Sequence, residues 1–541
     1  MHERCPRNPG RRRIIQTAAA VGLSSSLPSV TEARPDKARR AVKTSLDAKL
    51  KAHVKNVVVI YLENRSFNNL FANFPGVAQP LSGVPPEQYQ QMDRDGSTVL
   101  PSLPKIWKGL LPEKMAQQDI GGTKYIFGDD IFQDLPNAPF KLTDREGKPL
   151  PHGLITRDLC HLFYENQMQI NGGKNDSFVA WGDSGALVMG YYGDTNKHLN
   201  LWKIALDFTL CDNFFMGAFG GSFLNHQFLV SGRAPYYPDA ANAEAKRKIA
   251  VLEDGQTGYR LKLAGERTSA LKGFPTFERN GPVSPDHYVV NTMYPPYEPR
   301  PLPPDTRSSP DLTCPEQEHE TIGCLLSAQH VSWAWYAGGW QAVLDGHGEG
   351  NKPNFQYHHQ PFNYFKQFAP GKEARSEHLR DGGQGDSPIS NKFIADALAG
   401  KLPAVAFYKP QGNLNLHAGY SDIESGDAHV ANVIEHLKKS PQWKDMVIVI
   451  TFDENGGWWD HVAPPKGDRW GPGSRVPAIV VSPYAKKGAV DHSFYDTTSI
   501  LRFITRLHDL PLLPGLAERD KAFDARRERP PGDLTGALSF R

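Results

Sequence analysis

Two long runs of apolar, largely β-branched residues constrain the fold of this chain most, because such runs form strands that are buried on both faces of a sheet. Residues 54–62 read Val-Lys-Asn-Val-Val-Val-Ile-Tyr-Leu, and residues 446–452 read Met-Val-Ile-Val-Ile-Thr-Phe. Strands that alternate with helices indicate an α/β protein with a mostly parallel sheet and helices on both faces. Four further elements fit this pattern: strands at 402–408 and 476–482, and helices at 427–437 and 497–504.

The first strand and the later ones are far apart in the sequence, which predicts long loop-rich insertions in one catalytic domain over residues 34–515. The insertions are expected at about 75–160 and 235–395, where Pro, Gly and aromatic residues are frequent. The Pro-rich stretch 294–304 excludes regular helix and central strand. We expect residues 516–541 to form a loose C-terminal tail.

Residues 1–33 are predicted to be an export signal of the twin-arginine type. Arg11, Arg12 and Arg13 precede a modestly apolar stretch that runs to Leu23. The alternative is a basic, disordered tail. The signal predicts a periplasmic or secreted protein. After it, no stretch approaches the roughly 18 apolar residues that a membrane span needs, so no stable membrane insertion is expected.

The charge balance argues against nucleic acid as a partner, because 61 Lys and Arg stand against 59 Asp and Glu. The cysteines are interpreted as structural. Cys314 and Cys324 flank a short polar loop and could pair in an oxidising compartment, and Cys160 and Cys211 could pair or remain buried thiols.

Acidic and polar pairs follow the two principal strands. Glu63-Asn64 follows the first run and Asp453-Glu454 follows the second. In open α/β sheets, ligands bind beyond the carboxyl ends of the strands. Carboxylate and amide oxygens suit a divalent cation, which can offset charge as a phosphate ester breaks. Helix capping is the alternative for either pair alone.

Ser222 is the candidate nucleophile, since Gly220 and Gly221 before it allow a tight turn. A helix that begins at this point would offer free N–H groups to a phosphate oxygen. The alternative is an ordinary helix N-cap. Several histidines stand near polar motifs, where imidazoles could stabilise phosphate oxygens or protonate a leaving alkoxide. These are His161, His358, His359, His417 and His461.

Several motifs, in order, resemble the bacterial phosphoesterase family, which holds acid phosphatases of the respiratory-burst-inhibiting type and non-zinc phospholipases C. The resemblance spans about residues 54–510. It departs from the usual pattern at Asn68, where Asp is common, and at His226, where the phospholipases often have Arg. The matching motifs lie at 62–67, 171–178, 222–226, 452–465 and 475–483.

The resemblance implies an alkaline-phosphatase-like fold and one divalent metal ion. It implies ligation by Glu63, Asn64, Asp453 and Glu454, with Ser222 as nucleophile and also a ligand. It also implies that His161, His417 and one of His358 or His359 face the phosphate, with nearby His152 the alternative to His161. Oxygen-rich ligation leaves calcium, zinc, manganese and magnesium open.

The predicted function is a metal-dependent acid phosphatase that hydrolyses phosphate monoesters through a Ser222 phosphoenzyme. The alternative is a phospholipase C that releases a phosphorylated headgroup from phospholipid. The resemblance implies extra β domains in the larger phospholipases, and this chain stops soon after its last expected helix, which favours the phosphatase. A weaker alternative is an inactive phosphate-binding periplasmic protein, which would have lost a ligand or the nucleophile.

Overall fold

The structure, a computed structural model, describes residues 45–238, 242–300, 312–347 and 354–540. The predicted export signal lies outside these residues and stays a prediction, as does the location of the protein. Among the described residues, no helix is both long and apolar enough to cross a bilayer.

The centre of the molecule is an eight-stranded sheet. Strands β11, β1, β10, β8 and β9 are parallel neighbours, and only β12 runs antiparallel to both of its neighbours. The predicted α/β class with a mostly parallel sheet is therefore confirmed. Across the sheet the strands are β13 (Ala489–Asp491), β6 (Thr209–Cys211), β12 (Ala478–Val481), β11 (Met446–Phe452), β1 (Asn56–Leu62), β10 (Val405–Lys409), β8 (Trp333–Gly338) and β9 (Leu379–Gly383).

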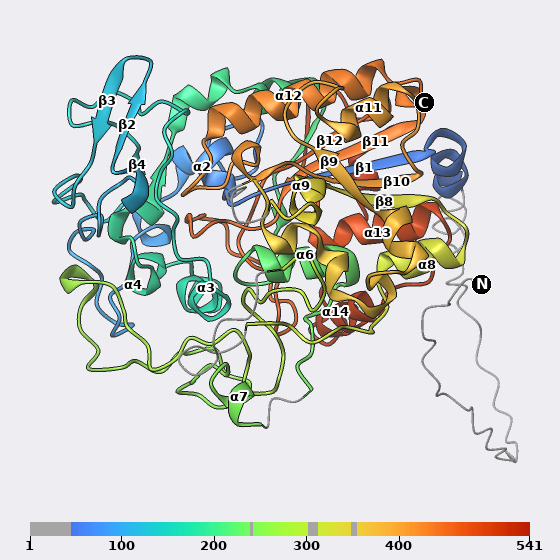
Figure 1. Cartoon of the computed structure of the whole chain (residues 1–541). Helices are drawn as coiled ribbons and strands as arrows, with labels where there is room; N and C mark the ends of the chain where they lie inside the picture. The colour runs from blue at the N-terminus through green and yellow to red at the C-terminus, as the bar shows by residue number, and fades with distance from the viewer. Residues whose placement is uncertain (1–44, 239–241, 301–311, 348–353, 541) are drawn as a thin grey trace, which may run out of the picture.

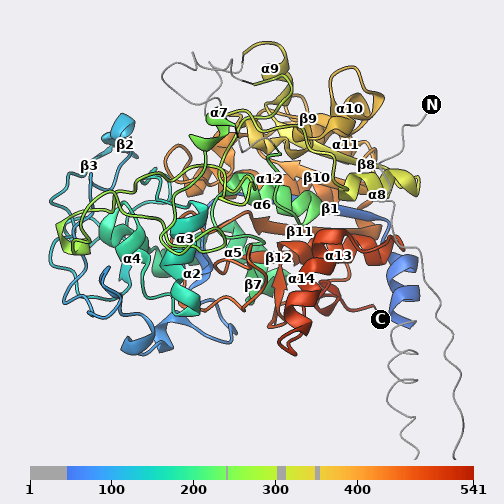
Figure 2. The ribbon, with the colours of Figure 1, turned by 90° about the horizontal axis from the view of Figure 1, so that it is seen from below.

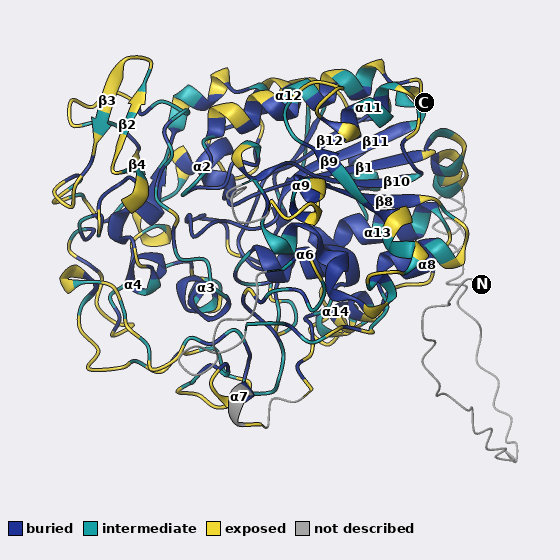
Figure 3. Ribbon diagram, viewed as in Figure 1, coloured by how far each residue is buried: buried dark blue, intermediate teal, exposed yellow. Residues whose placement is uncertain are grey.

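Helices cover both faces of this sheet (Figure 1). On one face lie α11 (Lys392–Leu398) and α12 (Ile423–Lys439). On the other lie α6 (Ser222–Ser231), α8 (Ile322–Ala328) and α13 (Thr497–Leu507), and Figure 2 shows the molecule from their side. The six inner strands, from β6 to β8, are buried along their whole length (Figure 3), as their largely apolar sequences require, whereas the edge strands β9 and β13 are partly exposed.

The remaining elements surround this core. Further helices are residues 45–53, α2 (Phe67–Phe71), α3 (Phe163–Ile170), α4 (Phe178–Trp181), α5 (Asn200–Asp207), α7 (Ala243–Lys246), α9 (Trp340–Leu344), α10 (Glu373–His378) and α14 (Pro514–Asp524). The short strands are β2 (Gln117–Ile120), β3 (Thr123–Ile126), β4 (Phe140–Lys141), β5 (Gly190–Tyr191), β7 (Phe214–Phe215) and β14 (Tyr495–Asp496).

The segment predicted as an insertion at 235–395 differs from that expectation, because it supplies β8 and β9 to the main sheet. Strand β8 reads Trp-Ala-Trp-Tyr-Ala-Gly, so its burial comes from aromatic rather than β-branched residues. Within the described residues, the segment at 75–160 adds no strand to the main sheet, and its β2–β3 hairpin is a separate sheet.

The C-terminal residues are not a loose tail. Helix α14 is anchored by Arg519, which is 1% exposed and forms ion pairs with Asp468 and Asp496 at 3.0 and 2.7 Å. Phe523 and Phe540 are also buried. Because the segment is rich in charged residues, its sequence did not indicate the few residues that attach it to the core.

Cys314 does not form the pair with Cys324 that their spacing would have allowed, because Cys314 is a free, buried thiol. It lies 3.8 Å from the amide nitrogen of Gln317, which holds the sulfur within the core. Cys160 and Cys211 are also free thiols, so of the two alternatives for them the structure has the unpaired one.

Candidate active site

The carboxyl ends of β1 and β11 bring the two acidic pairs together. Leu62 lies opposite Phe452 in the parallel register, and the N–H of Asp453 donates to the carbonyl of Leu62 at 3.0 Å. Glu63, Asn64, Asp453 and Glu454 follow directly and are fully buried. Asn64 has a φ of +63°, a left-handed conformation that Asn tolerates better than most residues, and its N–H donates to Asp453 Oδ1 at 3.2 Å. One edge of the sheet thus gathers two strand tips.

Ser222 reaches the same point from the other side. It is the first residue of α6, and its Oγ lies 3.3 Å from Asn64 Oδ1 and 3.3 Å from Glu454 Oε1. The turn before Ser222 requires glycine at position 220, because its φ is +86° and a Cβ there would lie 2.5 Å from Phe163 Cα. Among the described residues no side chain caps α6, so its first-turn N–H groups remain open to an anion.

The donor set at this point fits a divalent cation. Asn64, Ser222, Asp453 and Glu454 present oxygens from a buried cluster, and Asp453 Oδ2 has no hydrogen-bond partner in the described part of the chain. Burial and the neighbouring Glu63 raise the pKa of Asp453 to about 7. Burial also raises the pKa of Glu454, although His161 opposes that rise. Buried carboxylates need positive charge nearby to compensate their own, and a bound cation would supply it.

Glu63 has a different environment from the other predicted ligands. Its Oε2 accepts from Asn415 Nδ2 and Tyr420 OH, both at 2.8 Å. Its Oε1 lies 2.6 Å from His359 Nε2 and 2.7 Å from Lys409 Nζ. Burial would raise the pKa of Glu63, but His359 and Lys409 outweigh that effect and hold it well below its usual range. Glu63 is therefore an ionised carboxylate that already has four close polar neighbours.

His161 lies beside Glu454. Its Nδ1 donates to the carbonyl of Leu159 at 2.6 Å, and its Nε2 lies 3.7 Å from Glu454 Oε1. Burial lowers the pKa of His161, but Glu454 and Asp158 outweigh burial and raise it to about 9. The ring of His417 lies 5.9 Å from that of His161, and burial lowers the pKa of His417. The pair therefore combines one protonated and one neutral imidazole.

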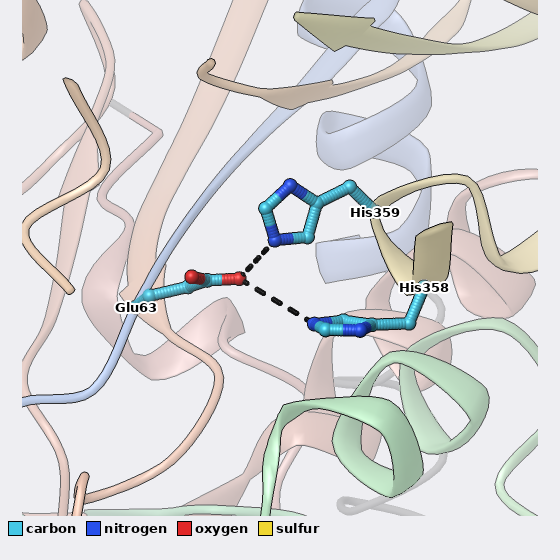
Figure 4. A group of neighbouring side chains, drawn as sticks. All are labelled: Glu63, His358 and His359. Carbon is cyan, nitrogen blue, oxygen red and sulfur yellow. Dashed lines mark ion pairs between the residues drawn. The ribbon is translucent and has the colours of Figure 1, made fainter. Parts of the chain in front are cut away.

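His358 and His359 both point toward one carboxylate oxygen of Glu63 (Figure 4). His359 is fully buried, and its Nδ1 accepts from the N–H of Gln356 at 3.4 Å, which places the ring proton on the Nε2 that faces Glu63. His358 Nε2 lies 4.0 Å from Glu63 Oε1, and its side chain is 12% exposed. Burial lowers the pKa of both, to about 4 for His359. His358 is the more accessible of the two.

Two other histidines considered from the sequence lie elsewhere. His461 Nδ1 contacts Asn68 Oδ1 at 2.9 Å and its Nε2 donates to the carbonyl of Gln79 at 3.0 Å, so this side chain ties loops together. His152 Nε2 contacts Asn196 Oδ1 at 2.9 Å. Of His152 and His161, the structure brings His161 to the strand tips.

Two residues of the cluster were missed from the sequence. His226 lies one helical turn after Ser222, and its Nδ1 donates to the carbonyl of Ser222 at 2.7 Å. The i, i+4 spacing was the signal that could have found it. Lys409 is the last residue of β10. The sequence did not indicate that it belongs to the site, because a single lysine after an apolar run usually marks a solvent-exposed strand end.

Comparisons with known proteins identify the family and relatives of this chain. The model of the Phosphoesterase family matches residues 54–511. Phospholipase C B of Mycobacterium tuberculosis is 23% identical over 521 residues, which cover 90% of this chain and 78% of that protein. Non-specific phospholipase C6 of Arabidopsis thaliana is 34% identical over 151 residues, which cover 22% of this chain and 29% of its own length.

Two solved structures are also similar in part. A protein in the alkaline phosphatase superfamily from Vibrio parahaemolyticus has a TM-score of 0.28 and 11% identity, covering 60% of this chain and 63% of its own. A phosphonate monoester hydrolase from Silicibacter pomeroyi has a TM-score of 0.22 and 18% identity, covering 63% and 74%. The assignment depends on the sequence match, which extends over most of the chain. This chain belongs to the Phosphoesterase family and is a phosphoric ester hydrolase.

Proposed function

We propose that this chain cleaves phosphodiesters of the phospholipid type, as a metal-dependent phospholipase C that uses Ser222 as its nucleophile. The observation that carries the proposal is the position of Ser222 Oγ, 3.3 Å from an oxygen of each strand tip. The relatives named phospholipase C, one of which aligns with 90% of the chain, support the substrate class.

The residues that would hold the metal ion are Asn64, Asp453, Glu454 and Ser222, with Glu63 beside them. When bound, a divalent cation would offset charge on the phosphate oxygens and lower the pKa of the serine hydroxyl. The first-turn N–H groups of α6 would bind a phosphate oxygen. His358, which is partly accessible, would donate a hydrogen bond to one of the remaining oxygens.

The residues support a two-step displacement. Ser222 Oγ attacks phosphorus and passes its proton to Glu454, whose Oε1 lies 3.3 Å away. The bond from phosphorus to the leaving oxygen breaks, and that alkoxide takes a proton from His161, whose raised pKa keeps it protonated at neutral pH. Water then attacks phosphorus and gives a proton to His161, while Ser222 Oγ leaves and recovers its proton from Glu454.

An acid phosphatase is the second candidate, and one observation favours it. The imidazolium of His161 and the open N-terminus of α6 together attract negative charge, which suits the dianion of a phosphate monoester better than the monoanion of a diester.

Assays with p-nitrophenylphosphorylcholine and p-nitrophenyl phosphate, side by side, separate the two candidates. A higher kcat/KM for the first supports the phospholipase, and a higher value for the second supports the phosphatase. Removal of metal by chelation and the Ser222→Ala substitution should each abolish turnover of both substrates. Ser425→Ala, on the exposed surface of α12, is the matched control and should leave both activities unchanged.

A further inference from the structure

A cavity of about 310 Å³ lies beside the turn before Ser222, and the proposed reaction does not use it. Small-molecule sites in proteins have volumes of about 300–1,000 Å³, so the cavity is large enough for part of a ligand. Its walls come mainly from α3, the turn before Ser222, the loop at 257–259 and the segment at 464–472. The apolar side chains of these walls are Phe163, Ile170, Phe219, Pro464, Pro465 and Pro472.

The cavity and the active site are built from the same segments. Phe163 stands two residues after His161 in the chain. Phe219 stands three residues before Ser222, and its ring centre lies 6.3 Å from that of Phe163. The turn that follows Phe219 packs against the segment before α3, because a Cβ on Gly221 would lie 3.2 Å from His161 Cδ2. A ligand in the cavity would therefore contact the segments that position both the nucleophile and the proton donor.

The cavity walls contain three charged residues, two of which are paired with other parts of the chain. Asp468 forms an ion pair with Arg519 at 3.0 Å, and Arg469 forms an ion pair with Asp286. Lys466 is the third, and it is exposed. Apolar walls with a cation at their exposed edge suit an amphiphile, whose apolar chain lies against the walls while its anionic phosphate stays outside them.

The proposed mechanism places the leaving part of the substrate on this side of the active site. The leaving alkoxide takes its proton from His161, and α3 with Phe163 begins two residues later. In a phospholipase C reaction that alkoxide belongs to diacylglycerol, whose acyl chains are the apolar part of the substrate. A small polar leaving group would leave the apolar walls in contact with water.

We propose that the cavity binds an acyl chain of the leaving diacylglycerol, so that the enzyme prefers phosphodiesters whose leaving group is apolar. This inference rests on the proposed function, because it assigns a subsite to the substrate named there. Moving one CH₂ group from water into an apolar site strengthens binding about fourfold. The value of kcat/KM should therefore rise with chain length until the cavity is filled.

Two short phosphatidylcholines, dibutanoyl and dihexanoyl, test the proposal when both are kept below the concentrations at which they form micelles. In the wild type, kcat/KM should be at least about tenfold higher for the dihexanoyl lipid, because each of its chains has two more CH₂ groups. Gln167→Trp fills the cavity from α3 and should lower this ratio to about threefold or less, with the value for the dibutanoyl lipid little changed. Gln341→Trp, on the exposed surface of α9, is the matched control and should keep the wild-type ratio.

Equal kcat/KM for the two lipids in the wild type, or an unchanged ratio in folded Gln167→Trp, would overturn the proposal. Thr257→Trp fills the cavity from an exposed loop and replaces Gln167→Trp if that variant fails to fold. No turnover of either lipid would refute the proposed function instead, and calorimetry with dihexanoylglycerol then tests the cavity alone. Binding to the wild type that is at least about tenfold weaker in the filled variant supports the cavity as an acyl site, and no binding overturns it.

Discussion

The ion pair between His161 and Glu454 gives a prediction with a definite size. His161 Nε2 lies 3.7 Å from Glu454 Oε1, and the pKa of His161 is raised from 6.5 to about 9. That rise corresponds to about 3.4 kcal/mol in favour of the imidazolium. A charge pair at this distance contributes about 4 kcal/mol at an effective dielectric constant of about 20. Glu454 therefore accounts for most of the rise.

Replacing Glu454 by Gln should return the pKa of His161 to 6.5 or below, because burial then acts with little opposition. Asp158→Asn is the matched control. Asp158 Oδ1 lies 3.6 Å from His161 Nδ1, but its side chain is 51% exposed and solvent screens it, so we expect a fall of less than about one pH unit.

NMR titration of isotopically labelled histidine in the metal-free protein measures both values, with His161→Asn to assign the signal. Because the folded-state pKa lies above the unfolded value of about 6.5, the contribution to stability is present below pH 6.5 and is lost as the pH rises through about 9. The difference between the unfolding free energies at pH 6 and at pH 10 should therefore be smaller in Glu454→Gln than in the wild type. A wild-type pKa near 6.5, or a value unchanged in Glu454→Gln, would refute the reasoning.

The remaining predictions concern the metal, the nucleophile loop and the C-terminal helix. Metal binding must remove the proton of Asp453, because its pKa is raised to about 7. The affinity for the metal ion should therefore fall at least about tenfold per pH unit below pH 7. Calorimetry that shows constant affinity from pH 7 to pH 5 would contradict this. Gly220→Ala should lower the free energy of unfolding in urea by more than about 1 kcal/mol and impair turnover. Gly96→Ala is the control, because Gly96 has a φ of +72° but no atom within 4 Å of a new Cβ. It should lower the free energy of unfolding by less and leave turnover intact. Arg519→Met leaves Asp468 and Asp496 without their buried partner and should lower the free energy of unfolding by about 3–5 kcal/mol. Arg526→Met, on the surface, should lower it by less than about 0.5 kcal/mol. Equal losses of stability in the two variants would show that α14 is not anchored as described.

The central strands and the strand-tip residues could be predicted because local sequence determines them. Strand β11 occupies the predicted residues 446–452, and β1 begins two residues inside the predicted run. Parallel strands end at one edge, so Glu63 and Asp453 had to be neighbours once both strands were recognised. The position of Ser222 beside them followed only from the family motifs.

Other parts of the structure depend on contacts that local sequence does not record. Strand β8 is buried through Trp333 and Trp335, which read locally as a loop-rich aromatic segment. His226 and Lys409 have roles that arise from partners on other elements, Ser222 and Glu63. Arg519 holds α14 through carboxylates more than 20 residues away in sequence. Buried charge pairs of this kind are visible only when the chain is folded.

The covalent intermediate tests the central claim most directly. Wild-type protein is mixed with the faster of the two chromogenic substrates, quenched in acid within one turnover, digested and analysed by mass spectrometry. The account predicts that the phosphoryl group, with its headgroup if the substrate is a diester, is found on the peptide that contains Ser222, and that Ser222→Ala gives neither adduct nor turnover. A modified residue other than Ser222, or wild-type turnover in Ser222→Ala, would contradict it.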